Sequence, residues 1–240
     1  MPVGDPSLDD QRAFWDAWNA DHRAGALDAF TARQAAQADR EARALARRLG
    51  RPLDILDVGC GIGWLGAALA PYGRVTGTDL SSEAVAMGRS RYPAVRFVAG
   101  DFATADLGGP YDLVVSADAI AHVADQAGFV ARVAEVLRPA GVFLLMTQNA
   151  FVWTRSSTLA PRGAGQLRDW PSLGRLRHLL GPSFRITRVG SIVPGGDQGV
   201  LRASAWAMRG AAALRLGRLV VPVLEHARIG RELVITATRR

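Results

Sequence analysis

The segment Asp57–Gly66, DVGCGIGWLG, holds the residues whose spacing best suits ligand binding, and it can be read in two ways. From Gly61 it matches G-x-G-x-x-G, which is typical of nicotinamide enzymes. From Asp57 it reads D-x-G-x-G-x-G, an acid at the end of a strand followed by alternating glycines. Both patterns let a ligand approach the backbone, because glycine lacks a Cβ and the start of a helix offers unpaired N–H groups. The glycines alone therefore do not identify the ligand.

Three acids at the ends of successive predicted strands favour the pattern that starts at Asp57. Asp57 itself suits the positively charged ammonium of a methionine moiety, directly or through water, and would repel a pyrophosphate. Asp79 is placed to accept hydrogen bonds from both hydroxyls of a ribose, which either cofactor requires. Asp101 suits the amino group of an adenine, with Phe102 lying against the ring. The set indicates an adenosyl ligand that also carries an amine.

Charge and composition restrict the function classes. All 29 basic residues are arginine, and the absence of lysine excludes the Tyr-x-x-x-Lys pair of short-chain dehydrogenases. Residues 151–240 hold 15 arginines against 4 acids, whereas residues 1–150 hold 14 arginines against 18 acids. No dense basic run interleaved with aromatics is present, so a nucleic-acid partner is not expected. The basic last third fits an anionic small substrate, an acidic carrier domain or a solvated arginine surface.

The elements that must position these residues follow from the apolar pattern. Nearly continuous apolar runs such as DLVVSA and GVFLLMT predict strands that are covered on both faces. Helical stretches separate them, and residues 125–137, for example, place Phe129, Val133 and Val136 on one face. Strands alternating with helices predict an α/β fold with a doubly wound, mostly parallel sheet. The predicted strands are 53–58, 74–79, 95–100, 112–117, 141–147, 184–193 and 232–238.

The chain reads as a single domain in three parts. In the last part, Ser172 is predicted to cap a helix over 170–180. A helical insertion over about 200–227, interrupted by Pro222, either covers a face of the sheet or forms the contact of a homodimer. The three parts are an N-terminal helical lid (1–50), a cofactor-binding core (51–150) and a C-terminal part with substrate-side loops and the insertion (151–240).

Residues 50–150 resemble class I S-adenosylmethionine-dependent methyltransferases of the small-molecule type. The motifs are Asp57–Gly63, Asp79, Asp101–Phe102, YDLVVSADAIAHV (111–123) and VLRPAGVFLLMT (136–147), in the family's order and spacing. The resemblance implies a Rossmann-like, seven-stranded sheet of order 3-2-1-4-5-7-6 with an antiparallel last strand and helices on both faces. It also implies S-adenosylmethionine as the cofactor. The cofactor-binding residues would be Asp57, Gly59, Gly61, Gly63, Asp79, Leu80, Asp101, Phe102 and Ser116.

His122, which follows the fourth predicted strand, is the candidate general base. In similar O- and N-methyltransferases a histidine here has that role, and an ordinary pKa near ~6.5 suits proton removal at neutral pH. The alternative is a capping or core histidine. Asp118, four residues earlier, would orient the ring if this turn is helical. The remaining histidines, His22, His178 and His226, are scattered, Cys60 stands alone, and no metal-ligand spacing is present, so no metal is predicted.

Tryptophans outside the core motifs are candidates for closing the site over a substrate. Trp15 and Trp18, with Phe14, lie in a predicted N-terminal helix that either forms a flap over the cofactor or packs onto the domain. Trp153, Arg155 and Trp170 follow the fifth predicted strand and either line the acceptor pocket or belong to the core.

The function expected is a cytoplasmic methyltransferase that acts on a hydroxyl, or else an amine, of a small molecule, as in natural-product biosynthesis. One cysteine, no signal peptide and no apolar run of ~20 residues support a cytosolic protein without a membrane partner. Two alternatives stay open. The fold can catalyse cyclisation or elimination without methylation, or it can serve as a non-catalytic partner subunit.

Overall fold

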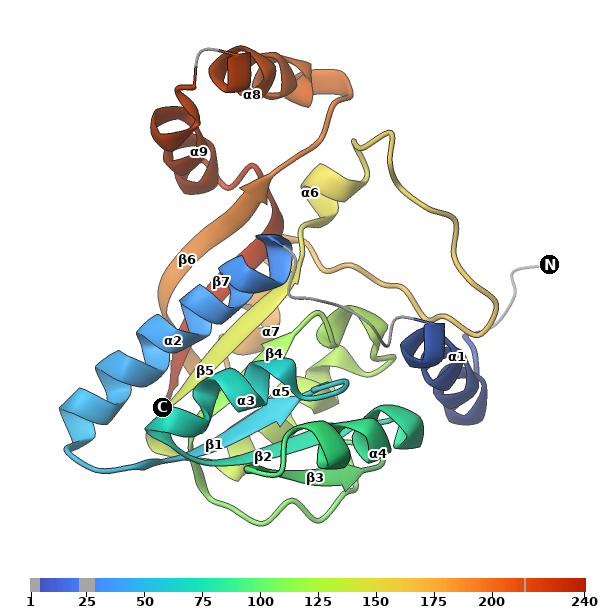
Figure 1. Cartoon of the computed structure of the whole chain (residues 1–240), viewed down its shortest axis with the longest axis vertical. Coiled ribbons are helices and arrows are strands. Elements are labelled where there is room, and N and C mark those ends of the chain that lie inside the picture. Colours follow the sequence, from blue (N-terminus) through green and yellow to red (C-terminus); the bar gives the residue numbers. More distant parts are fainter. Residues whose placement is uncertain (1–4, 22–28, 214) are drawn as a thin grey trace.

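The computed structural model describes residues 5–21, 29–213 and 215–240. Its strands are β1 (Leu53–Val58), β2 (Gly73–Asp79), β3 (Val95–Ala99), β4 (Tyr111–Ala117), β5 (Leu137–Gln148), β6 (Phe184–Pro194) and β7 (Gly230–Arg239). They form one seven-stranded sheet in the order β3-β2-β1-β4-β5-β7-β6 (Figure 1). β7 runs antiparallel to β5 and β6, and the other neighbouring pairs are parallel. The predicted fold, strand order and antiparallel last strand are confirmed.

Helices cover both faces of this sheet because successive strand residues point to opposite sides. Ile55 of β1 faces the layer formed by α2, α3 and α4, whereas Leu56 faces α5 and α7. In the central strands β1, β4 and β5, side chains on both faces are buried, which explains why these strands are nearly all apolar rather than alternating. The helices are α1 (Leu8–Asp21), α2 (Ala29–Leu49), α3 (Trp64–Leu69), α4 (Ser82–Arg91), α5 (Gln126–Val136), α6 (Ala150–Trp153), α7 (Leu173–Leu180), α8 (Arg202–Ala213) and α9 (Gly217–His226), with short 3-10 helices η1 (Ala70–Tyr72), η2 (Ile120–His122) and η3 (Gly199–Leu201).

Polar side chains start several of these helices. Ser172 accepts a hydrogen bond from the Arg175 N–H at the start of α7, as predicted. Asp125 accepts one from the Gly128 N–H at the start of α5. Such caps satisfy N–H groups that lack a partner in the first turn, and each stabilises a helix by roughly 1 kcal/mol. None of the described helices is long and apolar enough to cross a membrane.

The two parts of the predicted lid lie in different places. α2 packs on the sheet, with Ala38, Ala42 and Leu45 buried in the core, so it belongs to the layer that covers β1. α1 lies apart, beside α4 and beyond the carboxyl ends of the parallel strands (Figure 1). Of the described residues before β1, therefore, only α1 remains as a candidate lid. Residues 22–28, which include His22, lie outside the described residues.

The insertion between β6 and β7 forms a helical hairpin, α8 and α9, which projects from the body of the protein (Figure 1). The predicted interruption at Pro222 is wrong, because Pro222 lies inside α9 and the break falls between Ala213 and Gly217. An interior proline removes one backbone hydrogen bond and crowds the carbonyl four residues earlier, yet α9 continues through Pro222. Glu225 anchors α9, since it accepts a hydrogen bond from the Val193 N–H and pairs with Arg33 of α2.

The tight turn after β1 generates a stability prediction. Gly59 has φ +73°, and a Cβ there would lie 2.5 Å from the Ala119 Cβ. Gly59→Ala should lower the free energy of unfolding by roughly 2–5 kcal/mol, because a left-handed alanine and overpacking each cost energy. Gly210→Ala is the matched control, since Gly210 lies in α8 with open space around its Cβ position. That control should raise stability by about 0.5–1 kcal/mol. Equal effects of both substitutions in urea unfolding would contradict the packing argument.

Candidate active site

The glycine loop that follows β1 is folded tightly against the neighbouring strand. The N–H groups of Gly59 and Cys60 donate to the Thr78 carbonyl of β2, at 2.9 and 3.0 Å. Gly59, Gly61 and Gly63 all have positive φ, which glycine adopts without strain. Above Gly61 the nearest atom to a hypothetical Cβ is the Asn19 Oδ1 at 3.8 Å, so the loop is open there.

Asp79, at the end of β2, fixes this loop in place. Its carboxylate accepts hydrogen bonds from the Gly61 N–H at 2.7 Å and from the Ser81 N–H at 2.9 Å. Burial raises the pKa of Asp79, and these two N–H groups partly offset that effect. One carboxylate therefore connects the loop after β1 with the turn that starts α4.

Asp57, the last residue but one of β1, lies beneath the same loop and is 1% exposed. Its carboxylate lies toward α3, where the Gly66 N–H interacts with it, and its Oδ2 has no hydrogen-bond partner among the described residues. Burial raises the pKa of Asp57 to about 7, and the nearby charge of Asp79 adds to the effect. Ser116, at the end of β4, also buries a hydroxyl without a partner in the described structure. Unpartnered buried oxygens are costly and indicate a place for a ligand donor or cation.

The structure places the adenine-side candidates at the adjacent strand ends. Asp79 pairs in register with Ala99 of β3, two residues before Asp101. The Asp101 carboxylate accepts from the Ala103 N–H at 3.0 Å. The Phe102 ring is half-buried and packs 5.1 Å from the Phe129 ring of α5, and Leu80 is half-buried beside Asp79. The predicted cofactor residues thus share one edge of the sheet.

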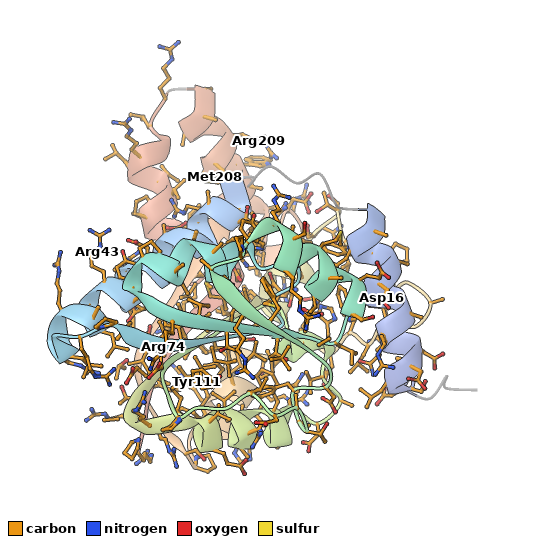
Figure 2. The ribbon with its side chains drawn as sticks, turned by 60° about the horizontal axis from the view of Figure 1, so that its bottom comes forward. Asp16, Arg43, Arg74, Tyr111, Met208 and Arg209 are labelled. Atoms are coloured by element: carbon orange, nitrogen blue, oxygen red, sulfur yellow. The ribbon has the colours of Figure 1, made fainter. Side chains whose placement is uncertain are left out.

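α1 lies over this edge and contributes polar contacts that the sequence analysis missed. Asp16, labelled in Figure 2, accepts a hydrogen bond from the Ser81 Oγ at 2.6 Å and from the Glu83 N–H at 3.3 Å. Asn19 is buried one turn further on, with its side-chain oxygen near Gly61. Asp16 and Asn19 are three residues apart and therefore share a helix face, a signal that was available beside the aromatic pattern.

The aromatic side of α1 reaches the candidate base. The Trp15 ring lies 4.8 Å from the His122 ring, and Trp18, which is largely exposed, lies 5.9 Å from Trp15. The long segment after α6 passes over α1 on its other side (Figure 1). A Cβ at Gly163 would lie 2.6 Å from the Phe14 ring. α1 is thus held between α4, η2 and this segment.

His122 lies in η2 with a defined protonation pattern. Its Nδ1 lies 2.6 Å from the Leu167 carbonyl, which can only accept, so Nδ1 carries the proton and Nε2 is free of one in the neutral ring. Burial lowers the pKa of His122, while the Leu167 bond raises it and the charge of Arg168 lowers it. The neutral, basic form is therefore favoured at neutral pH.

Asp118 does not orient this ring, contrary to the prediction. Residues 120–122 form a 3-10 turn rather than an α-helix, and Asp118 has φ +62°. Its carboxylate instead accepts from the Gln34 side chain at 2.9 Å, and Gln34 also donates to Glu232 of β7 at 2.7 Å. Burial raises the pKa of Asp118 to about 6 and the pKa of Glu232 well above its usual value. Sequence reasoning missed this pair because its members lie far apart in the chain.

The candidate acceptor residues divide into two groups. The Trp153 and Trp170 rings lie 5.7 Å apart, and the guanidinium groups of Arg231 and Arg168 lie over them at 5.3 and 5.2 Å. Trp170 Nε1 and Arg231 Nε are buried without a hydrogen-bond partner among the described residues. Arg155 does not join this group, because its guanidinium lies over the Phe151 ring of α6. Arg231, which neighbours Glu232 on β7, points to the opposite face of the sheet and was missed.

Other titratable residues do not add to the site. His178 lies exposed on α7 and His226 exposed on α9. Cys60 is buried, which raises its pKa. Within the described ranges, no group of three His, Cys, Asp or Glu side chains could hold a metal ion.

A cavity of about 560 Å³ lies at the opposite, amino edge of the strands. Figure 2 labels Arg74 and Tyr111, which line it. The arginines Arg74 and Arg138 there are paired with Asp54. This cavity is remote from the glycine loop, so its size does not make it the active site.

Comparison with known proteins agrees with this geometry. A family described as methyltransferase domain matches residues 55–141. A probable S-adenosylmethionine-dependent methyltransferase of Mycolicibacterium smegmatis is 39% identical over 112 residues, which are 45% of this chain and 44% of the relative. A ubiquinone biosynthesis O-methyltransferase of Methylobacterium sp. is 34% identical over 125 residues, or 49% of each chain. The chain thus spans less than half the length of either relative.

The fold is shared along the whole chain. A crystal structure of the 1,6-didemethyltoxoflavin-N1-methyltransferase of Burkholderia thailandensis, with S-adenosylhomocysteine bound, has a TM-score of 0.61 and 20% identity. That comparison covers 100% of this chain and 92% of the other. Residues 55–141 thus match a methyltransferase-domain family, and the chain is similar in sequence over about half of its length, and in fold over all of it, to S-adenosylmethionine-dependent methyltransferases.

Proposed function

We propose that the protein binds S-adenosylmethionine and transfers a methyl group to a hydroxyl, or else an amine, of a small-molecule acceptor, as in secondary metabolism. The observation that carries the proposal is the placement of Asp57, Asp79 and Asp101 at three adjacent strand ends around an open glycine loop. When bound, this cofactor supplies a methyl group already activated on a sulfonium. The protein must then supply position, charge and a place for the acceptor proton.

The residues present fit such a cofactor. Asp79 offers a carboxylate for the ribose hydroxyls, and Asp101 with Phe102 offers an acceptor and a ring for the adenine. Asp57, whose buried Oδ2 lacks a partner, supplies negative charge for the ammonium. Leu80, Ser116 and the backbone of Gly59, Gly61 and Gly63 complete the proposed binding site.

On the acceptor side, His122 takes the proton. Its Nε2 is the unprotonated nitrogen, and the Leu167 carbonyl holds the ring in that tautomer. Trp15 lies against His122 and, with Trp18, helps to exclude water from the site. Trp153 and Trp170 provide an apolar wall, while Arg231 and the Trp170 N–H support an acceptor with a negative or oxygen-rich group.

Two of the similar proteins are named as a ubiquinone biosynthesis O-methyltransferase and a 1,6-didemethyltoxoflavin-N1-methyltransferase, which supports a small-molecule acceptor and leaves the acceptor atom to experiment. Two other functions would give different results. A non-methylating enzyme would take up the cofactor without forming a methylated product. A scaffold subunit would not take it up.

Asp79→Ala should raise the Kd for S-adenosylhomocysteine at least ~100-fold, because the two ribose hydroxyls of the ligand would lose the carboxylate that accepts their hydrogen bonds. Titration calorimetry measures this. Asp106→Ala is the matched control, since Asp106 also accepts from a turn N–H but lies exposed outside the site. Wild-type protein that binds no S-adenosylhomocysteine would refute the proposal.

Cofactor binding should release a proton near neutral pH. The pKa of Asp57 is raised to about 7, so free protein retains part of that proton, and a nearby cation favours the ionised form. Calorimetry in buffers of different ionisation enthalpy measures the release. Asp57→Asn should abolish it and weaken binding.

The same substitution should stabilise the free protein. Folding raises the pKa of this carboxyl above its unfolded value near ~3.9. The protein therefore loses stability as the pH rises from the unfolded pKa to the folded pKa, and Asn, which does not ionise, removes this loss. The gain in Tm should therefore be larger at pH 8 than at pH 5. An equal gain at both pH values would contradict the burial argument.

His122→Gln should lower kcat by roughly 10²–10⁴-fold while leaving the Kd for S-adenosylhomocysteine unchanged, because the ring acts on the acceptor proton. Since burial lowers the pKa of His122, the acid limb of the wild-type profile should lie below the ordinary histidine range. Methylation of phenolic acids and of their neutral amides provides the assay. His178→Gln on the exposed face of α7 is the control, and equal activities of the two variants would remove His122 as the base.

A further inference from the structure

The α8–α9 hairpin exposes several large apolar side chains. Trp206, Leu219 and Val223 are 66%, 68% and 65% exposed, and Val200 of η3 and Leu216 between the two helices are exposed as well. We call these five residues the hairpin surface. They are half of the ten large apolar side chains that are exposed in the described part of the chain. An apolar concentration of this kind on a soluble protein marks an interaction site.

Arginines are interleaved with this surface. Arg202, Arg209, Arg215 and Arg218 are all exposed, and no described acid forms an ion pair with them. The one acid between residues 199 and 229 is Glu225, which points inward to Arg33 and the Val193 N–H. Figure 2 labels Arg209 on α8, away from the amino edge that Arg74 and Tyr111 mark.

The spacing combines both kinds of side chain on the exposed ridges. Arg202, Trp206 and Arg209 are four and three residues apart along α8, so they share one ridge. Leu219 and Val223 are four residues apart on α9, with Arg218 beside them. Helices with basic residues flanking Trp and Leu are typical of segments that lie in the plane of a lipid interface.

The charge of the four arginines distinguishes between two partners for this apolar surface, a second copy of the chain and an anionic surface. A second copy of the chain would bring two sets of four unpaired arginines together, which opposes the homodimer considered for this insertion. An anionic surface neutralises them. The hairpin projects outward (Figure 1), and a fluid interface can accept such a convex element without a matching groove.

We propose that the α8–α9 hairpin docks the protein on an anionic phospholipid surface, with Trp206, Leu219 and Val223 at the acyl boundary and the arginines at the phosphates. This goes beyond the proposed function and does not depend on it. Docking would also orient the site. A cavity of about 190 Å³ is lined by Ser204 and Met208 of α8 and by Ser156 and Arg231, so the acceptor side lies next to the hairpin.

Vesicle flotation of the full chain tests the proposal. The protein should float with phosphatidylcholine vesicles that contain phosphatidylglycerol, less at high salt, and not with phosphatidylcholine alone. Arg209→Gln with Arg218→Gln should weaken binding roughly 30-fold, from about 1 kcal/mol for each arginine. Trp206→Ser with Leu219→Ser should weaken it at least ~10-fold.

Matched controls come from the exposed end of α2. Arg47→Gln with Arg48→Gln removes two exposed arginines, and Leu49→Ser removes a side chain that is 39% exposed, and neither should change flotation. Binding of S-adenosylhomocysteine by each variant reports the fold and the proposed function separately. Absence of flotation, equal flotation with neutral vesicles, or equal losses in the controls would overturn the proposal. So would a dimer in light scattering that Trp206→Ser with Leu219→Ser dissociates, which would assign the surface to a second copy.

Discussion

The carboxylate of Asp79 is the interaction on which the site depends. By accepting from the Gly61 and Ser81 N–H groups, it joins the loop after β1 to the start of α4. Ser81 in turn donates its hydroxyl to Asp16, which attaches α1. The elements around the proposed cofactor site are therefore connected through one buried charge. Because charge-assisted hydrogen bonds are stronger than neutral ones, this small network can hold open, glycine-rich backbone in one conformation.

The carboxyl edge concentrates charge that the free protein stabilises poorly. Burial raises the pKa values of Asp57 and Asp79. Burial also raises the pKa values of Asp118 and Glu232, which Gln34 of α2 connects. On the other face of the sheet, the half-buried Arg231 lies over the Trp153 ring. A strand such as β7 places Glu232 and Arg231 on opposite faces because its side chains alternate. Acidic and basic side chains thus lie close together at one end of the sheet. The acids suit a cationic cofactor, and the arginine suits a negative or oxygen-rich acceptor.

Local features of the sequence predicted the fold well. The strands were predicted because burial on both faces leaves continuous apolar runs, and Ser172 because a cap acts on its own first turn. The strand order came from the family resemblance. Contacts between distant segments were not predictable: the Leu167 carbonyl that orients His122, and the Gln34 bridge to Glu232, join residues that no local pattern relates. Asp118 was misjudged because the turn after β4 is not α-helical, and Pro222 because α9 continues through the proline.

The way α1 is attached has a consequence for access to the interior. Ser81 uses its oxygen to accept from the Ala84 N–H and its hydrogen to bind Asp16. If α1 separates, the first of these bonds survives, so α4 keeps its cap. The glycine loop can therefore become more exposed when only the contacts of α1 are lost, while the rest of the domain stays folded. Such a local opening has its own free energy, which differs from the free energy of global unfolding. Passage of ligands and resistance to denaturation are separate properties of this chain, and selection can tune either one alone.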